Sequence, residues 1–324
     1  MTRAFLRVAA CLACALSFAQ VAGADEWKPS GTVRLVVPVQ GGTVDVLARL
    51  VAPKLQEALG QPVIVEEKGG AGGNIGTDMV AKAPPDGTTI LVGFTAPITV
   101  NVTLFDKLPY DPLKDLAPIT LAVTTPQFLT VTPSLPVHTV AEFVKLAKER
   151  PGNLSYGSIS IGSASHLTME MFKSAAGINV VHIPYKGSAP AVTDLLAGRV
   201  QAAFLVPGNV LQYLKDGKLR VIASTGRHRF AATPDVPTMI ESGFDDFEAT
   251  AWIGFLAPGG TPRPIIDRYN REIVQALNAP DVRKRLTEMQ FEIVGSTPEE
   301  FDRYIRWEMP RWAKVIKETG AKVQ

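Results

Sequence analysis

The chain has 324 residues, which is long enough for two domains of roughly 100–150 residues each. Its composition, with 46% hydrophobic and 20% charged residues, excludes a disordered protein, because disorder requires low hydrophobicity and high net charge. The 33 Lys and Arg residues nearly balance the 31 Asp and Glu residues, which argues against a nucleic-acid-binding protein or one that binds anionic membranes.

The first 24 residues are predicted to be a secretory signal peptide. Arg3 and Arg7 precede an apolar stretch from Val8 to Ala19, and small residues lead to a cleavage site after Ala24. The apolar stretch is shorter than the roughly 20 residues that a membrane span needs. We therefore expect export to the periplasm, and cleavage leaves 31 basic against 31 acidic residues in a formally neutral mature chain.

Both cysteines of the chain, Cys11 and Cys14, lie in the predicted signal. The mature protein is therefore expected to have no disulfide, no thiolate metal ligand and no cysteine nucleophile. The residues that end at Cys11 resemble a lipobox. A lipoprotein therefore remains an alternative to a free exported protein, although the apolar segment in front of this cysteine is short.

The mature chain begins with a predicted α/β unit. Apolar runs and helical spacing alternate as strand, helix, strand, helix, strand at residues 33–37, 43–60, 63–65, 74–83 and 89–92. Such alternation implies a parallel sheet with crossover helices. Pro53 lies inside the first helical pattern and is expected to kink it, and Gly60 is expected to end it.

A second α/β unit follows in the middle of the chain. Its strands and helices are predicted at residues 154–156, 165–176, 179–183, 188–197 and 200–205. Two apolar segments, 121–132 and 251–257, are expected to link the two units. The last helices are predicted at residues 263–277, 280–288 and 298–319. If they pack on the first unit, domain 1 is discontinuous and comprises residues 25–121 and 252–324, while domain 2 comprises residues 122–251.

The run GSISIGSASH, at residues 157–166, can be interpreted as a serine nucleophile beside its base or as a cradle for a ligand. Ser163 and His166 can touch at a helix start, but no G-x-S-x-G elbow is present and the nearest acid, Glu170, lies further along the same helix. A serine hydrolase therefore remains only an alternative. The four histidines are scattered without a metal-ligand spacing, so no metal is predicted.

Five loops combine glycine with small hydroxyl residues, and most of them join a strand to a helix. They lie at residues 40–43, 69–74, 95–96, 158–165 and 186–188. In parallel α/β sheets the carboxyl ends of the strands form the ligand crevice. The free N–H groups of helix starts attract anions, and Ser or Thr side chains there can also donate hydrogen bonds to a carboxylate. Together these loops predict a shared anion site.

A family resemblance makes this prediction specific. It is carried, in order from about Pro29 to the end, by RLVVPVQGGTVDVLARLVAPKLQEALGQPVIVEEKGGAGGNIGTDMVAKAPPDGTTILVG, KLPYDPLKDLAPIT, HIPYKGSAPAVTDLLAGRVQ, PDVPTMIESG and GSTPEEF. These stretches closely resemble the Bug-type periplasmic substrate-binding proteins of tripartite tricarboxylate transporters.

The resemblance implies an α/β, two-lobed periplasmic binding protein fold, type II-like, in which two crossover strands join two parallel or mixed sheets. It implies a monomeric receptor, not an enzyme, with no cofactor or metal. This receptor is expected to close on a small carboxylate and to deliver it to membrane permease subunits. A ligand-sensing module that docks a sensor kinase is the alternative, because its binding chemistry would be the same.

The resemblance also implies which loops grip the carboxylate. They are the first loop, at residues 38–45, and the loop that leads into the helix of the second unit, at residues 158–166. Lys186 is a further candidate beside them. The predicted ligand-binding residues are Gln40, Gly41, Gly42, Thr43, Asp45, Asn74, Thr95, Ala96, Ser158, Ser160, Ser163, Ser165, His166, Tyr185 and Leu205.

The chain departs from the family pattern in three places. The first loop is one residue shorter than in relatives, and Pro53 stands where relatives carry an ordinary helix former. Phe204-Leu205-Val206 replaces the Phe-Asp-Asn that relatives often have at the end of a second-domain strand. Because that acid would suit an ammonium or hydroxyl group, we expect a ligand with a carboxylate and an apolar or aromatic remainder, not an amino acid.

Overall fold

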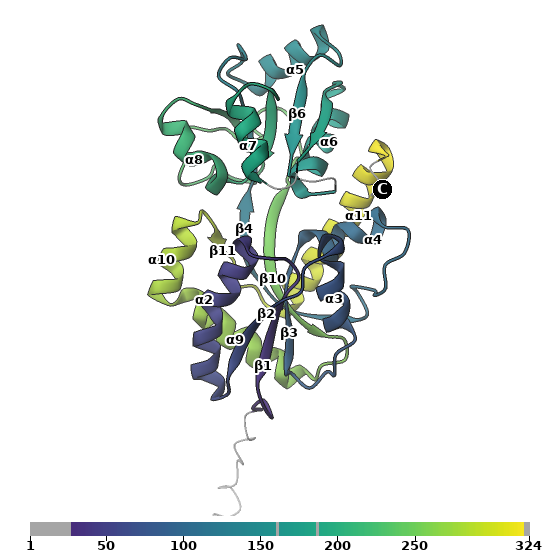
Figure 1. Ribbon diagram of the computed structural model, residues 1–324, viewed down its shortest axis with the longest axis vertical. Helices are drawn as coiled ribbons and strands as arrows, with labels where there is room; N and C mark the ends of the chain where they lie inside the picture. Colours follow the sequence, from purple (N-terminus) through teal and green to yellow (C-terminus); the bar gives the residue numbers. More distant parts are fainter. Residues whose placement is uncertain (1–26, 160–161, 186–187, 321–324) are drawn as a thin grey trace, which may run out of the picture.

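The computed structural model describes residues 27–159, 162–185 and 188–320. The chain forms two lobes, each built on a β-sheet flanked by helices, and two long strands run from one lobe toward the other (Figure 1). This arrangement confirms the predicted two-lobed α/β architecture. The predicted signal peptide lies outside the described residues.

The sheet of the first lobe has the strand order β11-β4-β10-β3-β1-β2. Its strands are β1 (Val33–Val37), β2 (Val63–Glu67), β3 (Thr89–Phe94), β4 (Leu116–Pro126), β10 (Thr250–Pro258) and β11 (Glu292–Ile293). Strands β2 and β3 pair in parallel with β1, as the alternation of strands and helices predicts, whereas β10 pairs antiparallel with both β3 and β4. The sheet is therefore mixed.

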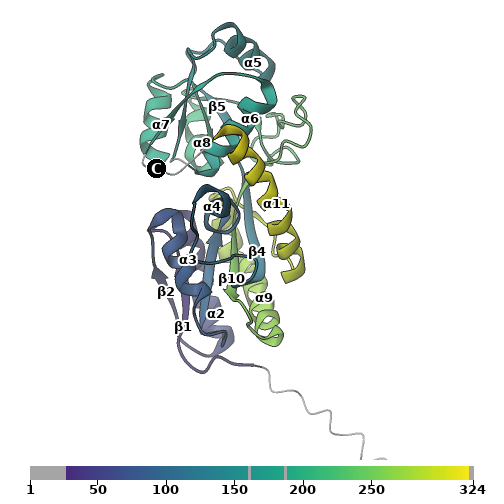
Figure 2. The ribbon, with the colours of Figure 1, turned by 90° about the vertical axis from the view of Figure 1, so that its right-hand side faces the viewer.

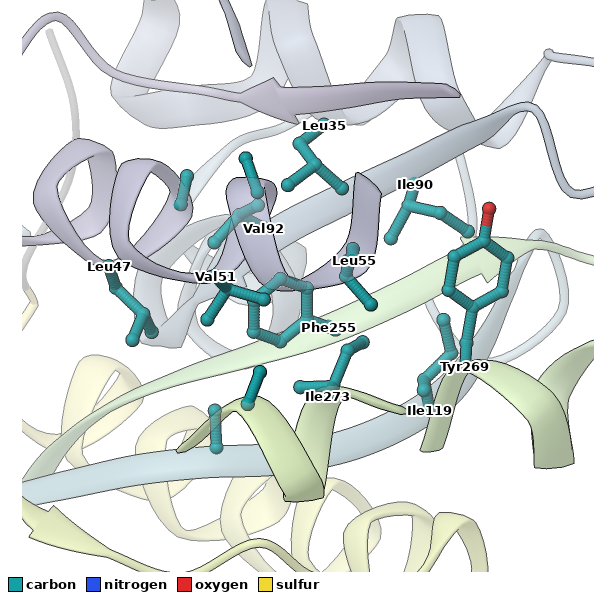
Figure 3. Close-up of a cluster of buried hydrophobic side chains, with 14 of the residues drawn as sticks. Leu35, Leu47, Val51, Leu55, Ile90, Val92, Ile119, Phe255, Tyr269 and Ile273 are labelled. Carbon is teal, nitrogen blue, oxygen red and sulfur yellow. The ribbon is translucent and has the colours of Figure 1, made fainter. Parts of the chain in front are cut away.

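Two groups of helices cover this first sheet. They are α2 (Gly42–Leu59), η2 (Ala71–Gly73), α3 (Asn74–Ala81), η3 (Ala96–Val100), α4 (Asn101–Leu104), α9 (Arg263–Asn278), α10 (Pro280–Glu288) and α11 (Pro298–Thr319). The apolar faces of α2 and α9 bury Leu47, Leu55 and Ile273 against Leu35 and Phe255 of the sheet (Figure 3). A second cluster, around Trp252 and Phe301, packs α11 against the sheet.

Helix α2 ends where the sequence predicts. Gly60 takes a left-handed conformation, with φ of 66°, and its N–H donates to the carbonyl of Gln56. Pro53 lies inside the helix without ending it. Helix α2 is continuous from Gly42. Its start follows the end of β1 closely and lies on the side of the first lobe that faces the second lobe (Figures 1 and 2).

The sheet of the second lobe has the strand order β7-β6-β8-β5-β9. Its strands are β5 (Phe128–Val131), β6 (Ser155–Ser158), β7 (Val181–Pro184), β8 (Ala202–Leu205) and β9 (Arg220–Ser224). Its helices are α5 (Val140–Glu149), α6 (Ala164–Ala176), α7 (Ser188–Leu196) and α8 (Pro207–Lys215). Strands β7 and β8 run parallel to β6, so the loop after β6 lies at the edge of the lobe where parallel strands end.

The chain crosses between the lobes twice. Strand β4 of the first sheet is separated from β5 of the second sheet by Gln127 alone, and the return path reaches β10 at Thr250. The first sheet therefore extends to Pro126, beyond the predicted boundary at residues 121/122. The division of the chain into two domains stays a prediction, and the strand ends favour residues 126–128 and 249–250 as its boundaries.

A hydrophobic cluster spans the two lobes beside these crossings. Leu104 and Trp312 of the first lobe are buried in the same cluster as Leu167 of the second lobe. Helix α11 reaches from the first sheet toward α6 in both views (Figures 1 and 2). Apolar contact therefore supplements the two covalent crossings in holding the lobes together.

Candidate ligand-binding site

Two glycines shape the first predicted binding loop, between β1 and α2. Gly41 and Gly42 have φ values of 61° and 78°, in the left-handed region that favours glycine. Gly41 is the N-cap of α2 and, as a glycine, has no side chain that could cap the helix. Gln40 and Thr43 are exposed beside the glycines. The loop thus presents backbone N–H groups at the positive end of an 18-residue helix, the physical basis of an anion site.

A charged network lies beside this loop. Arg49 donates from Nε to Oδ2 of Asp45 at 2.8 Å and from Nη2 to Oε1 of Glu67 at 3.4 Å. The same Glu67 oxygen accepts the N–H of Gly41 at 3.3 Å. The hydrogen bond to Asp45, followed by the attraction of its charge, raises the pKa of Arg49 above its ordinary value. The network connects the start of α2 with the end of β2.

Asp45 is the predicted residue in this network. Its side chain is mostly buried, and its Oδ1 has no hydrogen-bond partner in the part of the chain that the structure describes. A buried carboxylate oxygen needs a donor, so this atom is suited to hold an ordered water molecule. Sequence reasoning missed Arg49 and Glu67. The i, i+4 spacing of Asp45 and Arg49 is a signal that could have revealed the arginine.

Asn74, the first residue of α3, holds the glycine loop that precedes it. Its Oδ1 accepts hydrogen bonds from Asn101 Nδ2 at 2.6 Å and from the Tyr110 hydroxyl at 3.1 Å. Asn101 Nδ2 also donates to the carbonyl of Gly72 at 3.2 Å. The structure therefore gives this oxygen internal partners, and a contact between Asn74 and a ligand stays a prediction.

Thr95 lies at the junction of β3 with the crossing strand β10. Its Oγ1 accepts the N–H of Trp252 at 3.4 Å, and its carbonyl accepts the hydroxyl of Thr99 at 2.9 Å. Thr95 is buried, whereas Ala96 after it is partly exposed at the start of η3. Of these two predicted residues, Ala96 offers the more open side chain.

The second predicted loop, after β6, is stabilised by its own serines. Ser163 caps α6, because its Oγ accepts the N–H of His166 at 3.3 Å. The hydroxyls of Ser163 and Ser165 lie 2.9 Å apart, and Ser165 Oγ accepts the N–H of Ile159 at 3.0 Å. Ser163, Ser165 and His166 are therefore brought together. Ser160 lies outside the described residues.

Two histidines hold the ends of this second loop. His166 Nδ1 accepts the N–H of Gly162 at 3.0 Å, and Ser158 Oγ lies 2.6 Å from Nε2 of His182 on β7. Sequence reasoning did not include His182. The parallel pairing of β6 and β7 places His182 opposite Tyr156, two residues before Ser158 on the same face of the strand, and this register was not evident from the strand patterns alone.

The remaining predicted residues differ in exposure. The hydroxyl of Tyr185 donates to Asp194 Oδ2 at 2.7 Å, and its ring lies close to Gly157. Leu205 ends β8 and is buried in an apolar cluster with Phe128. Their contacts with a ligand stay predictions. Lys186 lies outside the described residues.

The two loops belong to different lobes, but the lobes approach each other closely here. A side chain at Gly162, in the second loop, would collide with Leu104 of α4 in the first lobe. The start of α2 and the end of β6 lie on the facing sides of the two lobes (Figure 1). A small molecule held by both loops would therefore bridge the lobes.

The geometry around Ser163 is that of a helix cap. Its hydroxyl contacts the backbone N–H of His166, while Nδ1 of the His166 ring accepts the Gly162 N–H. A nucleophile would instead have to share its proton with the ring of its base. Among the described residues no cluster of three or more His, Cys, Asp or Glu side chains is suited to bind a metal, and no helix has the length and apolar character of a membrane span.

Comparisons with known proteins agree with this geometry. A family model described as "Tripartite tricarboxylate transporter family receptor" matches residues 47–321. Protein BugT of Bordetella pertussis is 39% identical over 298 residues, which cover 91% of each chain. The solved structure of R. palustris Rpa4515 with adipate is 36% identical, with a TM-score of 0.79, and covers 91% of this chain and 99% of that one. MatC (Rpa3494) from Rhodopseudomonas palustris with bound malate is 32% identical, with a TM-score of 0.76, and covers 89% and 99%.

Proposed function

Since the chain belongs to the tripartite tricarboxylate transporter receptor family, we propose that it captures a small carboxylate between its two lobes and delivers it to the membrane subunits of a tripartite transporter. The family consists of periplasmic binding receptors, so the chain is a solute-binding receptor and the serine hydrolase alternative is excluded. Export with cleavage after Ala24 is part of the proposal.

The observation that carries the carboxylate class is the likeness to two structures with dicarboxylates bound. The chain covers nearly all of the adipate-bound and malate-bound proteins at 36% and 32% identity. The start of α2 supports the same class, because Gly41, as its N-cap residue, has no side chain to cap the helix and Gly42 follows it in the left-handed conformation. An oriented set of N–H groups at a helix start favours a carboxylate over a neutral ligand.

We propose further that the carboxylate carries an apolar or aromatic remainder. Phe204-Leu205-Val206 places no acid at the end of β8, and Leu205 is buried among apolar side chains. An ammonium group would therefore lack a carboxylate partner at this position. Binding would shift the protein from an open to a closed arrangement of the lobes, because the ligand contacts both.

The first experiment is a thermal-shift measurement on residues 25–324 with adipate, malate, benzoate and glutamate. A ligand at a hundredfold excess over its Kd stabilises the folded state by about 2.7 kcal/mol, which raises the Tm by about 4–5 °C for a chain of this size. We expect adipate or benzoate to raise the Tm and glutamate to leave it unchanged. A rise with glutamate alone would contradict the proposed ligand class.

Delivery to a transporter is tested by uptake. Cells that lack this chain should lose uptake of the acid that gives the thermal shift, and the full-length gene should restore it. Unchanged uptake would instead favour a ligand-sensing module that acts on a sensor kinase.

A further inference from the structure

The first binding loop already holds a carboxylate, which comes from the chain itself. Glu67 Oε1 accepts the N–H of Gly41, the N-cap residue of α2, at 3.3 Å. This N–H belongs to the loop that is proposed to bind the carboxylate of the ligand. A side chain of the same chemistry as the ligand therefore occupies one of its donors.

The end of β2 places Glu67 at this loop. Val37 of β1 pairs with Glu67 of β2 in the parallel ladder, and the N–H of Lys68 continues the ladder to the carbonyl of Val37 at 2.8 Å. Because successive side chains of a strand alternate between its faces, Glu66 points the other way. It forms ion pairs with Arg34 at 3.6 Å and with Lys68 at 3.0 Å.

We propose that Glu67 is an internal carboxylate that competes with the ligand for the N–H of Gly41 at the start of α2 and so lowers the affinity for carboxylates. This inference rests on the proposed function of the loop. Two carboxylates cannot share one N–H donor, and their like charges repel each other at short range. The ligand must therefore displace Glu67 from Gly41 when it binds.

Arg49 provides the position to which Glu67 is displaced. Its Nη2 already lies 3.4 Å from Glu67 Oε1, and its Nε is anchored to Asp45 at 2.8 Å. The arginine side chain is 56% exposed and the Glu67 side chain 33%, so both can move without opening the core. Glu67 can leave the Gly41 N–H and keep the guanidinium as its partner, which makes the exchange reversible.

The test compares Glu67→Ala with Glu66→Ala in the mature protein. Both variants remove one negative charge from the end of β2, but only the first removes the contact with Gly41. Isothermal titration calorimetry with adipate, malate and benzoate should show about twofold to fivefold tighter binding by Glu67→Ala, the range expected for a partly exposed charged contact. Glu66→Ala should bind like the unchanged protein.

Two further measurements separate competition from a general structural effect. Glu67→Gln keeps an acceptor but loses the charge, so its affinity should lie between those of Glu67→Ala and the unchanged protein. The gain in ligand affinity of Glu67→Ala over the unchanged protein should shrink as the salt concentration rises from 10 mM to 1 M, because ions screen exposed charges. In the ligand-free protein, the NMR signal of the Gly41 amide should shift in Glu67→Ala and stay in place in Glu66→Ala.

Each outcome decides the inference. If the unchanged protein binds one of the acids and Glu67→Ala binds it equally or more weakly, the competition is refuted while the proposed receptor function stands. If neither the unchanged protein nor Glu67→Ala binds any of the three acids, the carboxylate function fails and the inference fails with it. A gain that is equal in Glu66→Ala would assign the effect to net charge and overturn the role of Glu67.

Discussion

The imidazole rings of His166 and His182 stack with their centroids 4.0 Å apart and their planes 11° apart. Each ring holds one end of the same loop, His182 through Ser158 and His166 through Gly162. His166 Nδ1 is a hydrogen-bond acceptor in this contact, so it carries no proton. The pair therefore clamps the second predicted loop in a state that requires neutral imidazole at His166.

This clamp predicts a loss of stability in mild acid. Burial, followed by the charge of His166, lowers the pKa of His182 to about 4, and burial lowers that of His166. In the unfolded chain histidine titrates near 6.5. Between about pH 4 and 6.5 the unfolded state binds more protons, so stability should fall as the pH drops through this window. Circular dichroism should show a lower Tm at pH 4.5 than at pH 7, and a weaker pH dependence in His182→Gln.

The matched control for this prediction is His228→Gln, which removes an exposed histidine of the second lobe. It should keep the pH dependence of the unchanged protein. Equal pH dependence in His182→Gln and the unchanged protein would show that the stacked pair is not its source.

Glu308 of α11 predicts a pH effect of the opposite sign. The carboxylate is buried and accepts hydrogen bonds from Trp252 Nε1 at 2.7 Å and from the Thr99 hydroxyl at 2.8 Å. Burial raises its pKa to about 7 from an ordinary value of 4.5. The folded state binds more protons between these values, so this group lowers stability as the pH rises from 4.5 to 7. Urea denaturation should show that the difference in free energy of unfolding, Glu308→Gln minus the unchanged protein, is larger at pH 8 than at pH 5.

Glu318→Gln is the control, because it neutralises an exposed acid on the same helix. Its stability relative to the unchanged protein should hardly change between the two pH values. If Glu308→Gln loses stability at pH 8, the carboxylate is stabilising in its charged form and the assignment is wrong.

The two crossings between the lobes are joined through Thr225. Its Oγ1 donates to the carbonyl of Ala249 at 2.6 Å and accepts the N–H of Gln127 at 2.8 Å. Thr225→Val keeps the shape but leaves two buried backbone groups without this partner, which should cost about 1–3 kcal/mol in the free energy of unfolding. Urea denaturation measures this cost. Thr193→Val, at an exposed position of α7, should cost much less, and equal costs would contradict a special role for the crossing.

Gly76 allows α3 to pack against the ends of β1 and β2. A Cβ atom there would lie 2.7 Å from the carbonyl oxygen of Lys68 and 2.9 Å from Pro38 Cα. In an open helix Gly→Ala stabilises by up to about 1 kcal/mol, but overpacking against backbone costs about 1–3 kcal/mol. Gly76→Ala should therefore lower the Tm, whereas Gly31→Ala, with nothing within 4 Å, should not. A higher Tm in Gly76→Ala would show that α3 can move away freely.

The sequence alone determined the features that depend on neighbouring residues. Local hydrogen bonding ends α2 at Gly60 and begins α11 at its capping box, formed by Thr297 and Glu300. The alternation of strands and helices predicted both α/β units, because apolar periodicity reflects which face is buried. A capping box of the same kind, Thr139 with Glu142, begins α5, a helix that is absent from the predicted elements.

Only the tertiary structure decided which residues meet across elements. The contact of Glu67 with Gly41 joins β2 to the loop after β1, and that of His182 with Ser158 joins two neighbouring strands. The antiparallel position of β10 between β3 and β4 joins distant parts of the chain. Local periodicity shows that a strand is buried, but it contains no information on its neighbour or register. Those depend on how the side chains of the whole lobe pack together, since each pairing is stable only when its surrounding contacts form at the same time.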